Sequence, residues 1–467
     1  MPSLIADKKS VIMLLMNLPE AFIKRMDKLL GSDAGAFFAA HDKEAYKAFH
    51  LNTARMSKAD FEKWLSSQDK LTAAPCKNGY GYIYSLKDGS TIGSLSLHHA
   101  GAIYSQDPSA QLPVCGVEIS PDMRILDMCA APGGKTSQLA MAVDGGNGFV
   151  LANEPNPQRN RILISNIERM GYRNVISSCL DPADIADVYP GYFDLVLVDA
   201  PCSGEGMFRK YPESIDQWSV DNIMLCASRQ RDILNSAVRC LKDGGILIYS
   251  TCTYAPEEDE QQLEYMINEL GLLSFEPSPL VSGYALKTAD GAYRAYPHLY
   301  EGEGQFMAYL KKPGSEIRKY GSRLPSALKE LSTSEAKALK DSVGSLFDDH
   351  PLYKYRDRYV IVRSVPEILP ERGISSIGVT AAVYDEKKKR FVPHHQFFSA
   401  YGNELPCRLD LSPDDPDIRQ YLNGMELATG DGFSKGYGAV CVSTVALGGI
   451  RIAGGRAKNL YPKGLRE

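Results

Sequence analysis

The sequence predicts an α/β fold with a parallel, doubly wound sheet between about residues 111 and 312. Short apolar segments alternate there with segments of helical periodicity, which is the pattern of parallel strands joined by helices. One segment, Phe193–Asp199, is nearly all apolar, as expected for a strand that is buried on both faces. The 467-residue chain has 44% hydrophobic and 23% charged residues, which excludes a disordered, collagen-like or coiled-coil protein.

The predicted strands and helices of this region follow each other in a regular order. Strands are predicted at Arg124–Cys129, Phe149–Glu154, Val175–Cys179, Phe193–Asp199 and Gly245–Thr251, because each is a short apolar segment. Helices are predicted at Lys135–Val143, Pro157–Met170 and Arg229–Leu241. A Gly turn, Pro132-Gly133-Gly134, joins the first strand to the first helix.

The segment before residue 111 has a different pattern. A helix with one apolar face is predicted from Leu18, Phe22, Met26, Leu29 and Leu30. Asp42 is a plausible cap for a second helix that runs through Phe49. The Gly- and Tyr-rich segment from Gly79 to Tyr84 indicates a strand and a turn. Residues 1–110 are therefore expected to form an N-terminal α+β module.

The charge density rises after Pro313, and the periodicity weakens. A helix is predicted at Ser326–Ser342 and strands at Tyr359–Val365 and Gly378–Tyr384, followed by a charged turn. Residues 313–399 are expected to be a linker and a first C-terminal α/β module. Residues 400–467 are rich in Gly and short apolar runs, as small β-barrels are, and we expect a β-rich module there.

The composition also predicts a compartment. No apolar run approaches the roughly 18 residues that a transmembrane helix needs. The apolar stretch Val11–Met16 is too short for a signal peptide, and no small-residue cleavage site follows it. The ten cysteines form no Cys-x-x-Cys pair, and the eight histidines show no metal-ligand spacing, so we expect reduced thiols in the cytoplasm and no metal site.

Three strand ends carry features that suit an adenosine-containing cofactor, because ligands of a doubly wound sheet bind at the carboxyl ends of its strands. The first strand ends in the Gly turn, where the backbone can approach a ligand closely. The second ends in Glu154, an acid that suits the two hydroxyls of a ribose. The third runs into Asp181, which can accept a hydrogen bond from an adenine amino group. Because diphosphate-binding features are missing, S-adenosylmethionine fits better than NAD.

Two cysteines follow the ends of strands that should be neighbours in the sheet. Cys202 comes after the fourth strand and Cys252 after the fifth, so both thiols are expected to face one cleft. Methylation at C5 of a pyrimidine requires such a thiol, because a thiolate that adds at C6 makes C5 nucleophilic. Asp199, beside the base, can hydrogen-bond its polar edge and stabilise the charge that develops there.

Three segments of this region resemble the motifs of a known family. Cys-Ala-Ala-Pro-Gly-Gly-Lys at 129–135, Asp-Ala-Pro-Cys-Ser-Gly-Glu-Gly at 199–206 and Ser-Thr-Cys-Thr-Tyr at 250–254 are similar to motifs I, IV and VI of the RNA cytosine-C5 methyltransferases, the RsmB/RsmF and NOL1/NOP2/Sun family. The resemblance covers most of the chain and is greatest to the RsmF branch. Residues 18–22, 52–53 and 104–109 resemble its N-terminal module, 296–304 the end of its catalytic domain, and 458–466 its PUA-like module.

The resemblance implies a Rossmann-like class I methyltransferase domain with a mixed sheet at 111–312, an N-terminal RNA-binding module at 1–110 and a PUA-like RNA-binding module at 400–467. It implies that Cys252 is the nucleophile and that Cys202 promotes product release, with Asp199 near the target base. The residues implied to hold S-adenosylmethionine are Cys129, Ala130, Ala131, Pro132, Gly133, Gly134, Lys135, Glu154, Arg159, Asp181 and Asp199. One departure is Asp181-Pro182-Ala183, where relatives often have Asp-Gly-Arg.

Relatives in this branch methylate a cytosine in the decoding region of 16S rRNA, so the expected partner is 16S rRNA or the 30S ribosomal subunit, bound by a monomer. Because the formal net charge is −5, RNA binding requires clustered basic residues. The candidates are Arg209 and Lys210 beside the cleft and Arg456, Lys458, Lys463 and Arg466 near the C-terminus, with Phe208, Tyr211 and Tyr254 as a platform for an unstacked base. Two alternatives remain: a tRNA cytosine-C5 methyltransferase, and a vestigial methyltransferase that acts as a ribosome-assembly RNA-binding factor.

Overall fold

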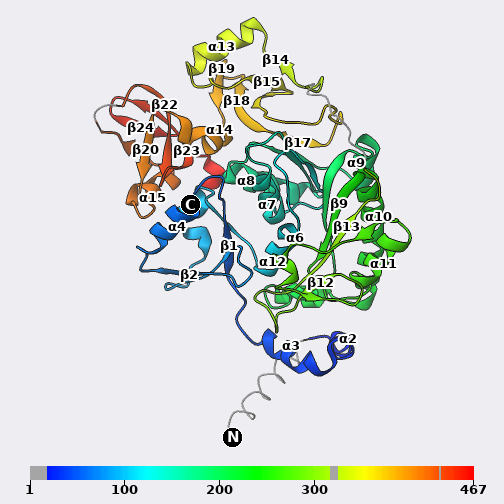
Figure 1. Ribbon diagram of the computed structural model, residues 1–467. Coiled ribbons are helices and arrows are strands. Elements are labelled where there is room, and N and C mark those ends of the chain that lie inside the picture. Colours follow the sequence, from blue (N-terminus) through cyan, green and yellow to red (C-terminus); the bar gives the residue numbers. More distant parts are fainter. Residues whose placement is uncertain (1–17, 316–323, 431–432, 467) are drawn as a thin grey trace.

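The computed structural model describes residues 18–315, 324–430 and 433–466 (Figure 1). The apolar stretch Val11–Met16, which is expected not to be a signal peptide, lies outside these residues. Within them, no helix is both long and apolar enough to cross a membrane.

A mixed sheet of ten strands forms the centre of the molecule (Figure 1). Its order is β11-β12-β13-β9-β8-β5-β6-β7-β17, with β10 paired to β13. The strands from β9 to β7 are parallel, whereas β13 and β17 run antiparallel to their neighbours β9 and β7. The strands are β5 (Arg124–Asp127), β6 (Phe149–Asn153), β7 (Val175–Ser178), β8 (Phe193–Asp199), β9 (Leu241–Thr251), β10 (Leu273–Ser274), β11 (Leu286–Lys287), β12 (Tyr293–Ala295), β13 (Gln305–Lys311) and β17 (Ile374–Ile377). This sheet confirms the predicted fold class.

Helices cover both faces of the central sheet. The helices α9 (Pro182–Val188), α10 (Val220–Cys240) and α11 (Glu260–Asn268) pack with residues such as Leu126 and Val196 in one apolar core. The helices α6 (Leu112–Cys115), α7 (Gly134–Ala142), α8 (Pro157–Met170) and α12 (Pro279–Ser282) pack on the other face with Ile125 and Leu195. Successive residues of β5 and β8 enter opposite cores because side chains alternate across a strand.

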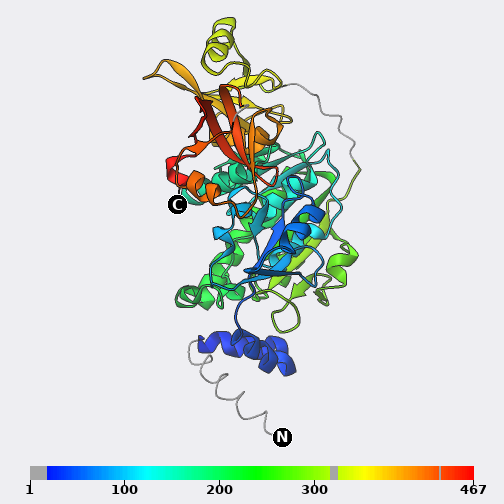
Figure 2. The same ribbon diagram turned by 90° about the vertical axis from the view of Figure 1, so that its left-hand side faces the viewer.

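The N-terminal module divides into two parts that Figures 1 and 2 show well apart. Helices α2 (Glu20–Leu30) and α3 (Ala34–His41) lie at one end of the molecule and pack against Phe208, Trp218 and Tyr254. A four-stranded antiparallel sheet, β2-β3-β1-β4, lies beside the central sheet. Its elements are β1 (Ala48–Leu51), β2 (Leu71–Pro75), β3 (Tyr82–Leu86) and β4 (Ile103–Ser105), with helices α4 (Lys58–Leu65) and α5 (Ser96–His99).

The helix predicted from Asp42 to Phe49 is wrong. Helix α3 ends at His41, and Asp42 lies just beyond its last turn instead of capping a new helix. Residues Ala48–Leu51 form β1, which is buried along its whole length between β3 and β4. Tertiary pairing on both sides of this segment therefore overrides its local helical pattern.

A five-stranded sheet, β14-β15-β16-β18-β19, lies at the end of the molecule opposite α2 (Figure 1). Its elements are β14 (Lys329–Glu330), β15 (Leu352–Tyr355), β16 (Arg358–Ile361), β18 (Val379–Asp385) and β19 (Arg390–Pro393), with helix α13 (Thr333–Val343). The helix predicted from Ser326 begins only at Thr333, because Ser332 and Glu335 form a capping box there.

The C-terminal module is a five-stranded sheet, β20-β22-β23-β24-β21, with helices α14 (His395–Tyr401) and α15 (Pro416–Leu422). Its strands are β20 (Arg408–Leu411), β21 (Leu427–Ala428), β22 (Gly436–Val442), β23 (Val445–Ala453) and β24 (Arg456–Asn459). This sheet shares one apolar core with the N-terminal module, in which Phe49 and Phe61 pack with Val440 and Leu447. The N-terminal sheet and the C-terminal sheet therefore form a single packed unit.

Candidate active site

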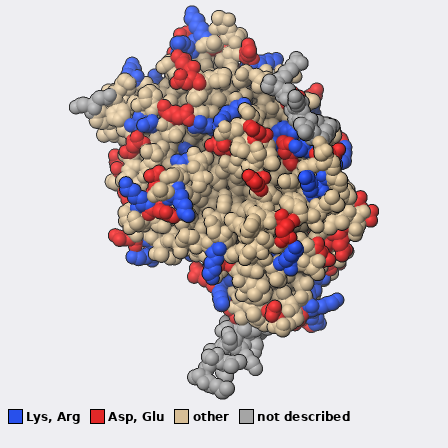
Figure 3. Space-filling model, in the orientation of Figure 1, with Lys and Arg blue, Asp and Glu red and all other residues tan. Residues whose placement is uncertain are grey.

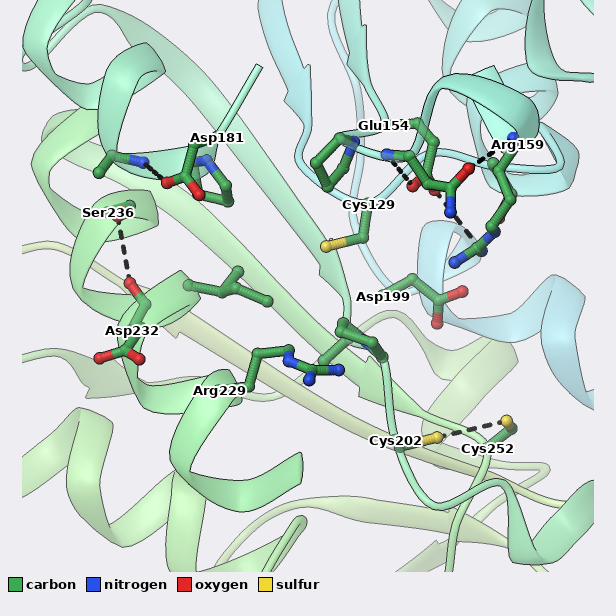
Figure 4. A pocket seen from close by; sticks show the side chains of 18 residues that line it. Cys129, Glu154, Arg159, Asp181, Asp199, Cys202, Arg229, Asp232, Ser236 and Cys252 are labelled. Carbon is green, nitrogen blue, oxygen red and sulfur yellow. Dashed lines mark hydrogen bonds and ion pairs between the residues drawn. The ribbon is translucent and has the colours of Figure 1, made fainter. Parts of the chain in front are cut away.

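Two cavities meet at the carboxyl ends of the parallel strands. The first, which we call the strand-end cavity, has a volume of about 760 Å³ and is drawn in Figure 4. The second, the inter-module cavity, has a volume of about 600 Å³ and is lined by both the N-terminal module and the central domain. Residues that line both cavities are Cys129, Ala131, Arg159, Asp199 and Cys252. Asp199 and Cys252 therefore face both cavities, and groups bound in the two cavities would meet beside these two residues.

The Gly turn after β5 leads directly into α7. Gly133 adopts a left-handed conformation with φ +115°, which L side chains rarely adopt. A Cβ on Gly134 would lie 3.2 Å from the Gln106 amide, so this turn packs closely against the N-terminal module. The turn places Lys135 in the interior, where its Nζ lies 2.8 Å from Asp199 Oδ2.

Asp199, the last residue of β8, is held by three donors. Besides the Lys135 ion pair, its Oδ1 accepts hydrogen bonds from Ser250 Oγ at 2.7 Å and from Gln305 Nε2 at 3.4 Å. The side chain keeps 34% of its surface exposed, so it is fixed in place and still faces the cavities. Such an arrangement suits a carboxylate that must contact a bound ring in one orientation.

The acidic residues predicted for a cofactor lie at the ends of the next two strands. Glu154 follows β6, is nearly buried, and accepts the Asn156 N–H at 3.0 Å. Arg159 lies 3.6 Å from Glu154 and donates to Ala131 O at 2.9 Å. Asp181 caps α9 by accepting the Ala183 N–H at 2.9 Å. Glu154, Arg159 and Asp181 line the strand-end cavity together with Cys129, Ala131 and Asp199. The remaining members of the predicted set lie elsewhere: Ala130, Pro132, Gly134 and Lys135 line the inter-module cavity, and Gly133 lines neither cavity.

One buried carboxyl group beneath the Gly turn was not predicted. Asp127, in β5, accepts the Thr136 hydroxyl at 2.7 Å through Oδ2, whereas its buried Oδ1 has no hydrogen-bond partner. Burial raises the pKa of Asp127 to about 7. The residue lines the inter-module cavity, and an acid at the end of a strand that also contains Arg124 gives no sequence signal of burial.

The two cysteines predicted to share a cleft do so. Cys202 and Cys252 have their sulfur atoms 3.4 Å apart, and both line the strand-end cavity (Figure 4). Both are free thiols. The hydrogen bond to Cys252, together with burial, raises the pKa of Cys202 well above its usual value. Cys202 therefore carries its proton at neutral pH.

A polar network beneath the two thiols escaped the sequence reasoning. Ser203 and Thr253, the residues after the two cysteines, have hydroxyl oxygens 2.8 Å apart. Two buried carboxyl groups, Glu205 and Glu258, accept hydrogen bonds from these hydroxyls. The run Glu257-Glu258-Asp259-Glu260 has the composition of an exposed surface, so the sequence alone gives no sign that Glu258 is fully buried.

The candidate RNA-binding residues lie in two kinds of environment. Arg209, which the sequence predicts to contact RNA, is only 7% exposed and forms a two-pronged ion pair with Glu303, so these donors are used inside the protein. Lys210 pairs with Asp107 at 2.7 Å but lines the inter-module cavity. Of the aromatic candidates, Phe208 and Tyr254 are buried in the core beneath α2, whereas Tyr211 is 53% exposed.

The basic residues of the C-terminal module lie mostly at the surface. Arg456, Lys458 and Lys463 are exposed, and Arg466 is half-buried with its guanidinium donating to Tyr461 O. On the face shown in Figure 3, Lys and Arg side chains are interspersed with Asp and Glu. Binding to RNA through this face would therefore depend on local groups of basic residues.

The strand order, the Gly turn and the strand-end cavity define the central domain as a Rossmann-like class I methyltransferase, with an N-terminal module and a C-terminal PUA module. Comparison with models of known protein families gives the same assignment for the central domain and for both flanking modules. The model described as "16S rRNA methyltransferase RsmB/F" matches residues 115–311, "N-terminal domain of 16S rRNA methyltransferase RsmF" matches 18–108, and "Methyltransferase RsmF PUA domain" matches 408–467. The chain belongs to the RsmF family of methyltransferases.

Individual relatives match over nearly the whole chain. Ribosomal RNA small subunit methyltransferase F of Vibrio cholerae (strain M66-2) is 30% identical over 96% of this chain and 98% of its own length. The protein of the same name from Klebsiella pneumoniae (strain 342) is 30% identical over 96% of each chain. Among solved structures, a methyltransferase homologue from Pyrococcus horikoshii is 28% identical, with a TM-score of 0.55 over 65% of this chain and 99% of that one. NSun6 from the same organism, solved with SFG, is 20% identical with a TM-score of 0.56 and shows the same fold.

S-adenosylmethionine is the cofactor of this methyltransferase, and the strand-end cavity fits it. Glu154 and Asp181 offer carboxylate oxygens for hydroxyl and amino groups, and Pro155, Ala183 and Ile233 offer apolar surface for a flat ring. The unpartnered Oδ1 of Asp127, a residue beneath the Gly turn that lines the inter-module cavity, suits a hydrogen-bond donor. In the strand-end cavity, a bound S-adenosylmethionine would be held by the two carboxylates and this apolar surface.

Proposed function

We propose that this protein methylates C5 of a cytosine in 16S rRNA through a covalent bond between Cys252 and C6 of the base. The observation that carries the proposal is the position of Cys252, which lines both the strand-end cavity and the inter-module cavity. The strand-end cavity lies on one side of the nucleophile and the inter-module cavity on the other, so cofactor and base can reach it from the two sides. The names of the relatives, which are small-subunit rRNA methyltransferases, support 16S rRNA as the substrate.

The reaction follows from the order of the groups around the base. The Cys252 thiolate adds to C6, and the ring electrons move to make C5 an enamine carbon. S-adenosylmethionine, when bound, supplies the methyl group that C5 takes. Cys202, 3.4 Å from Cys252, carries a proton in the resting enzyme and first gives this proton to solvent. Its thiolate then accepts the C5 proton, the C6–sulfur bond breaks, and the Cys252 thiolate leaves.

Asp199 and Lys135 orient the base in this scheme. Their ion pair of 2.8 Å lies at the wall that the two cavities share. The carboxylate accepts from the amino edge of cytosine, and the ammonium group balances the negative charge that develops when the thiolate adds. The burial of Lys135 strengthens its interaction, because the local dielectric is lower than that of water.

The flanking modules are proposed to bind the RNA. We assign residues 1–110 and 400–467 to RNA-binding modules, 111–312 to the methyltransferase domain and 313–399 to a connecting module. Lys210, Arg456, Lys458, Lys463 and Arg466 are the basic residues that would contact phosphates. The protein is proposed to act in the cytoplasm as a monomer on 16S rRNA or the 30S subunit.

Tritiated methyl transfer to 30S subunits, naked 16S rRNA and bulk tRNA, measured in parallel, tests the proposal. Label in 30S subunits or 16S rRNA, mapped to C5 of a cytosine, is the expected result. Label in tRNA alone would keep the chemistry and overturn the substrate. No label together with no binding of S-adenosylmethionine by calorimetry would indicate a vestigial domain. Cys252→Ala should abolish transfer, whereas Cys407→Ala, a cysteine of the C-terminal module, should not change it.

A further inference from the structure

We infer that Glu258 is a positioning residue, whose buried carboxyl group holds the loop of Cys202 in register with the loop of Cys252. The inference rests on the proposed function, because it concerns the two thiols of that reaction. Glu258 does not line either cavity and is fully buried, so it acts through its neighbours.

The need for such a residue follows from the topology. Strands β8 and β9 are paired up to Asp199 and Ser250, and both cysteines come after the last paired residues. Beyond this point the pairing of β8 with β9 no longer fixes the distance between the segment that carries Cys202 and the segment that carries Cys252. Gly204, in the Cys202 loop, has φ +72°, so this segment has left the extended conformation. Other contacts must therefore set the sulfur–sulfur distance.

Glu258 supplies these contacts to the Cys202 loop. Its Oε2 accepts the Ser203 N–H at 2.9 Å, and its Oε1 accepts the Ser203 hydroxyl. Gln230 of α10 donates through Nε2 both to Glu258 Oε2 and to Pro201 O, each at 3.0 Å. The residues on both sides of Cys202 are thus tied directly or indirectly to one carboxyl group.

The Cys252 loop is joined to the same network through hydroxyl groups. Ser203 Oγ lies 2.8 Å from Thr253 Oγ1, and Thr253 donates to Glu205 Oε2 at 3.1 Å. The Gly206 N–H donates to Cys252 O at 2.8 Å, which holds Cys252 independently of Glu258. Loss of Glu258 should therefore release the Cys202 loop more than the Cys252 loop.

This asymmetry predicts a specific kinetic defect. Cys252 should still attack the base in Glu258→Ala, whereas Cys202 would be misplaced for proton removal and adduct breakdown. A displacement of about 1 Å can lower a rate by about 100-fold. We expect turnover to fall between about 10- and 100-fold and a covalent RNA–protein adduct to accumulate on a denaturing gel.

Glu258→Gln separates positioning from proton transfer. A glutamine oxygen can accept the Ser203 and Gln230 N–H groups, and its amide can donate to Ser203 Oγ. The Ser203 hydroxyl then donates to Thr253, and Thr253 continues to donate to Glu205. Because the contacts to Ser203, Gln230 and Thr253 are all kept, we expect turnover within about threefold of the wild type and an unchanged pH–rate profile.

The experiment compares wild type, Glu258→Ala, Glu258→Gln, Ser203→Ala and the control Glu257→Gln by single-turnover methylation of 16S rRNA and by adduct gels. Glu257 is the neighbouring carboxylate and pairs with Arg25 of α2 instead. If wild type methylates no RNA, the proposed function fails; if wild type is active and Glu258→Ala matches it, this inference fails. A loss in Glu258→Gln equal to that in Glu258→Ala would also overturn it. Should Glu258→Ala not fold, Ser203→Ala, which removes only the bridging hydroxyl, must accumulate adduct for the inference to stand.

Discussion

Replacement of Arg209 by methionine tests whether this residue serves the fold or binds RNA. Arg209 Nε and Nη2 lie 2.7 and 2.8 Å from the two oxygens of Glu303, and Nη1 donates to Ala40 O at 2.8 Å. The side chains are only 7% and 2% exposed. Arg209→Met would leave the Glu303 carboxylate buried, with the Lys210 ammonium at 4.0 Å as its nearest remaining cation.

The magnitude follows from this burial. Removal of one partner of a buried ion pair destabilises a protein by about 3–5 kcal/mol, because the other charge stays buried without compensation. Glu303→Gln in the same chain removes that charge, so the double variant should recover about half of the loss or more. Because the pair is shielded from solvent, added salt should change the difference little.

The assay is urea unfolding at low and high salt, combined with RNA binding over a range of salt concentrations. We expect Arg209→Met to lower the free energy of unfolding, and the folded variant to keep the salt slope of RNA binding. The reasoning would be refuted if Arg209→Met had wild-type stability and if the slope of its log RNA-binding constant against log salt concentration fell by about one. Arg209 would then be a phosphate contact.

Three further predictions concern the active site. Cys202→Ala should trap a covalent RNA–protein adduct, and a denaturing gel without a shifted band would contradict its role in release. Gly133→Ala should destabilise the protein by about 1 kcal/mol or more and weaken S-adenosylmethionine binding, because φ is +115° there; calorimetry gives both values. Asp127 has a pKa raised to about 7, so its native form keeps a proton that the unfolded chain releases above about pH 4. The contribution of Asp127 to the free energy of unfolding should therefore fall by at most about 4 kcal/mol as the pH rises from about 4 to 7. Asp127→Asn should lack this pH dependence when unfolding is measured across the same range.

The fold of the central domain could be predicted because its strands are short, apolar and separated by amphipathic helices. Helix α8 and strand β8 have the predicted bounds, since a helix capped by Asn156 and Gly171 and a doubly buried strand leave strong local signals. The segment from Ala48 to Leu51 was misassigned, because its pairing with β3 and β4 depends on residues distant in the sequence.

The candidate site was predictable where side chains follow strand ends. Cys129, Glu154, Asp181, Asp199, Cys202 and Cys252 were placed from the strand pattern, and the structure puts them around one cavity. Glu258 and Asp127 could not be assigned, because nothing in the sequence tells a buried acid from an exposed one. The ion pair of Arg209 could not be predicted either, because its partner Glu303 is distant in the sequence and reaches it only in the folded chain.

Strand β17 has a consequence for the order in which the protein can be completed. Ile377 pairs with Ile176, so the strand beside β7 is made long after the rest of the central sheet has left the ribosome. Until then, β7 presents open N–H and C=O groups along an apolar edge, which favours pairing with other chains. A nascent chain, or a truncated protein that ends near residue 312, should therefore be prone to aggregation even though its motifs are complete. The connecting module between residues 313 and 399 thus covers this edge of the sheet once β17 has been made, in addition to linking its two neighbours.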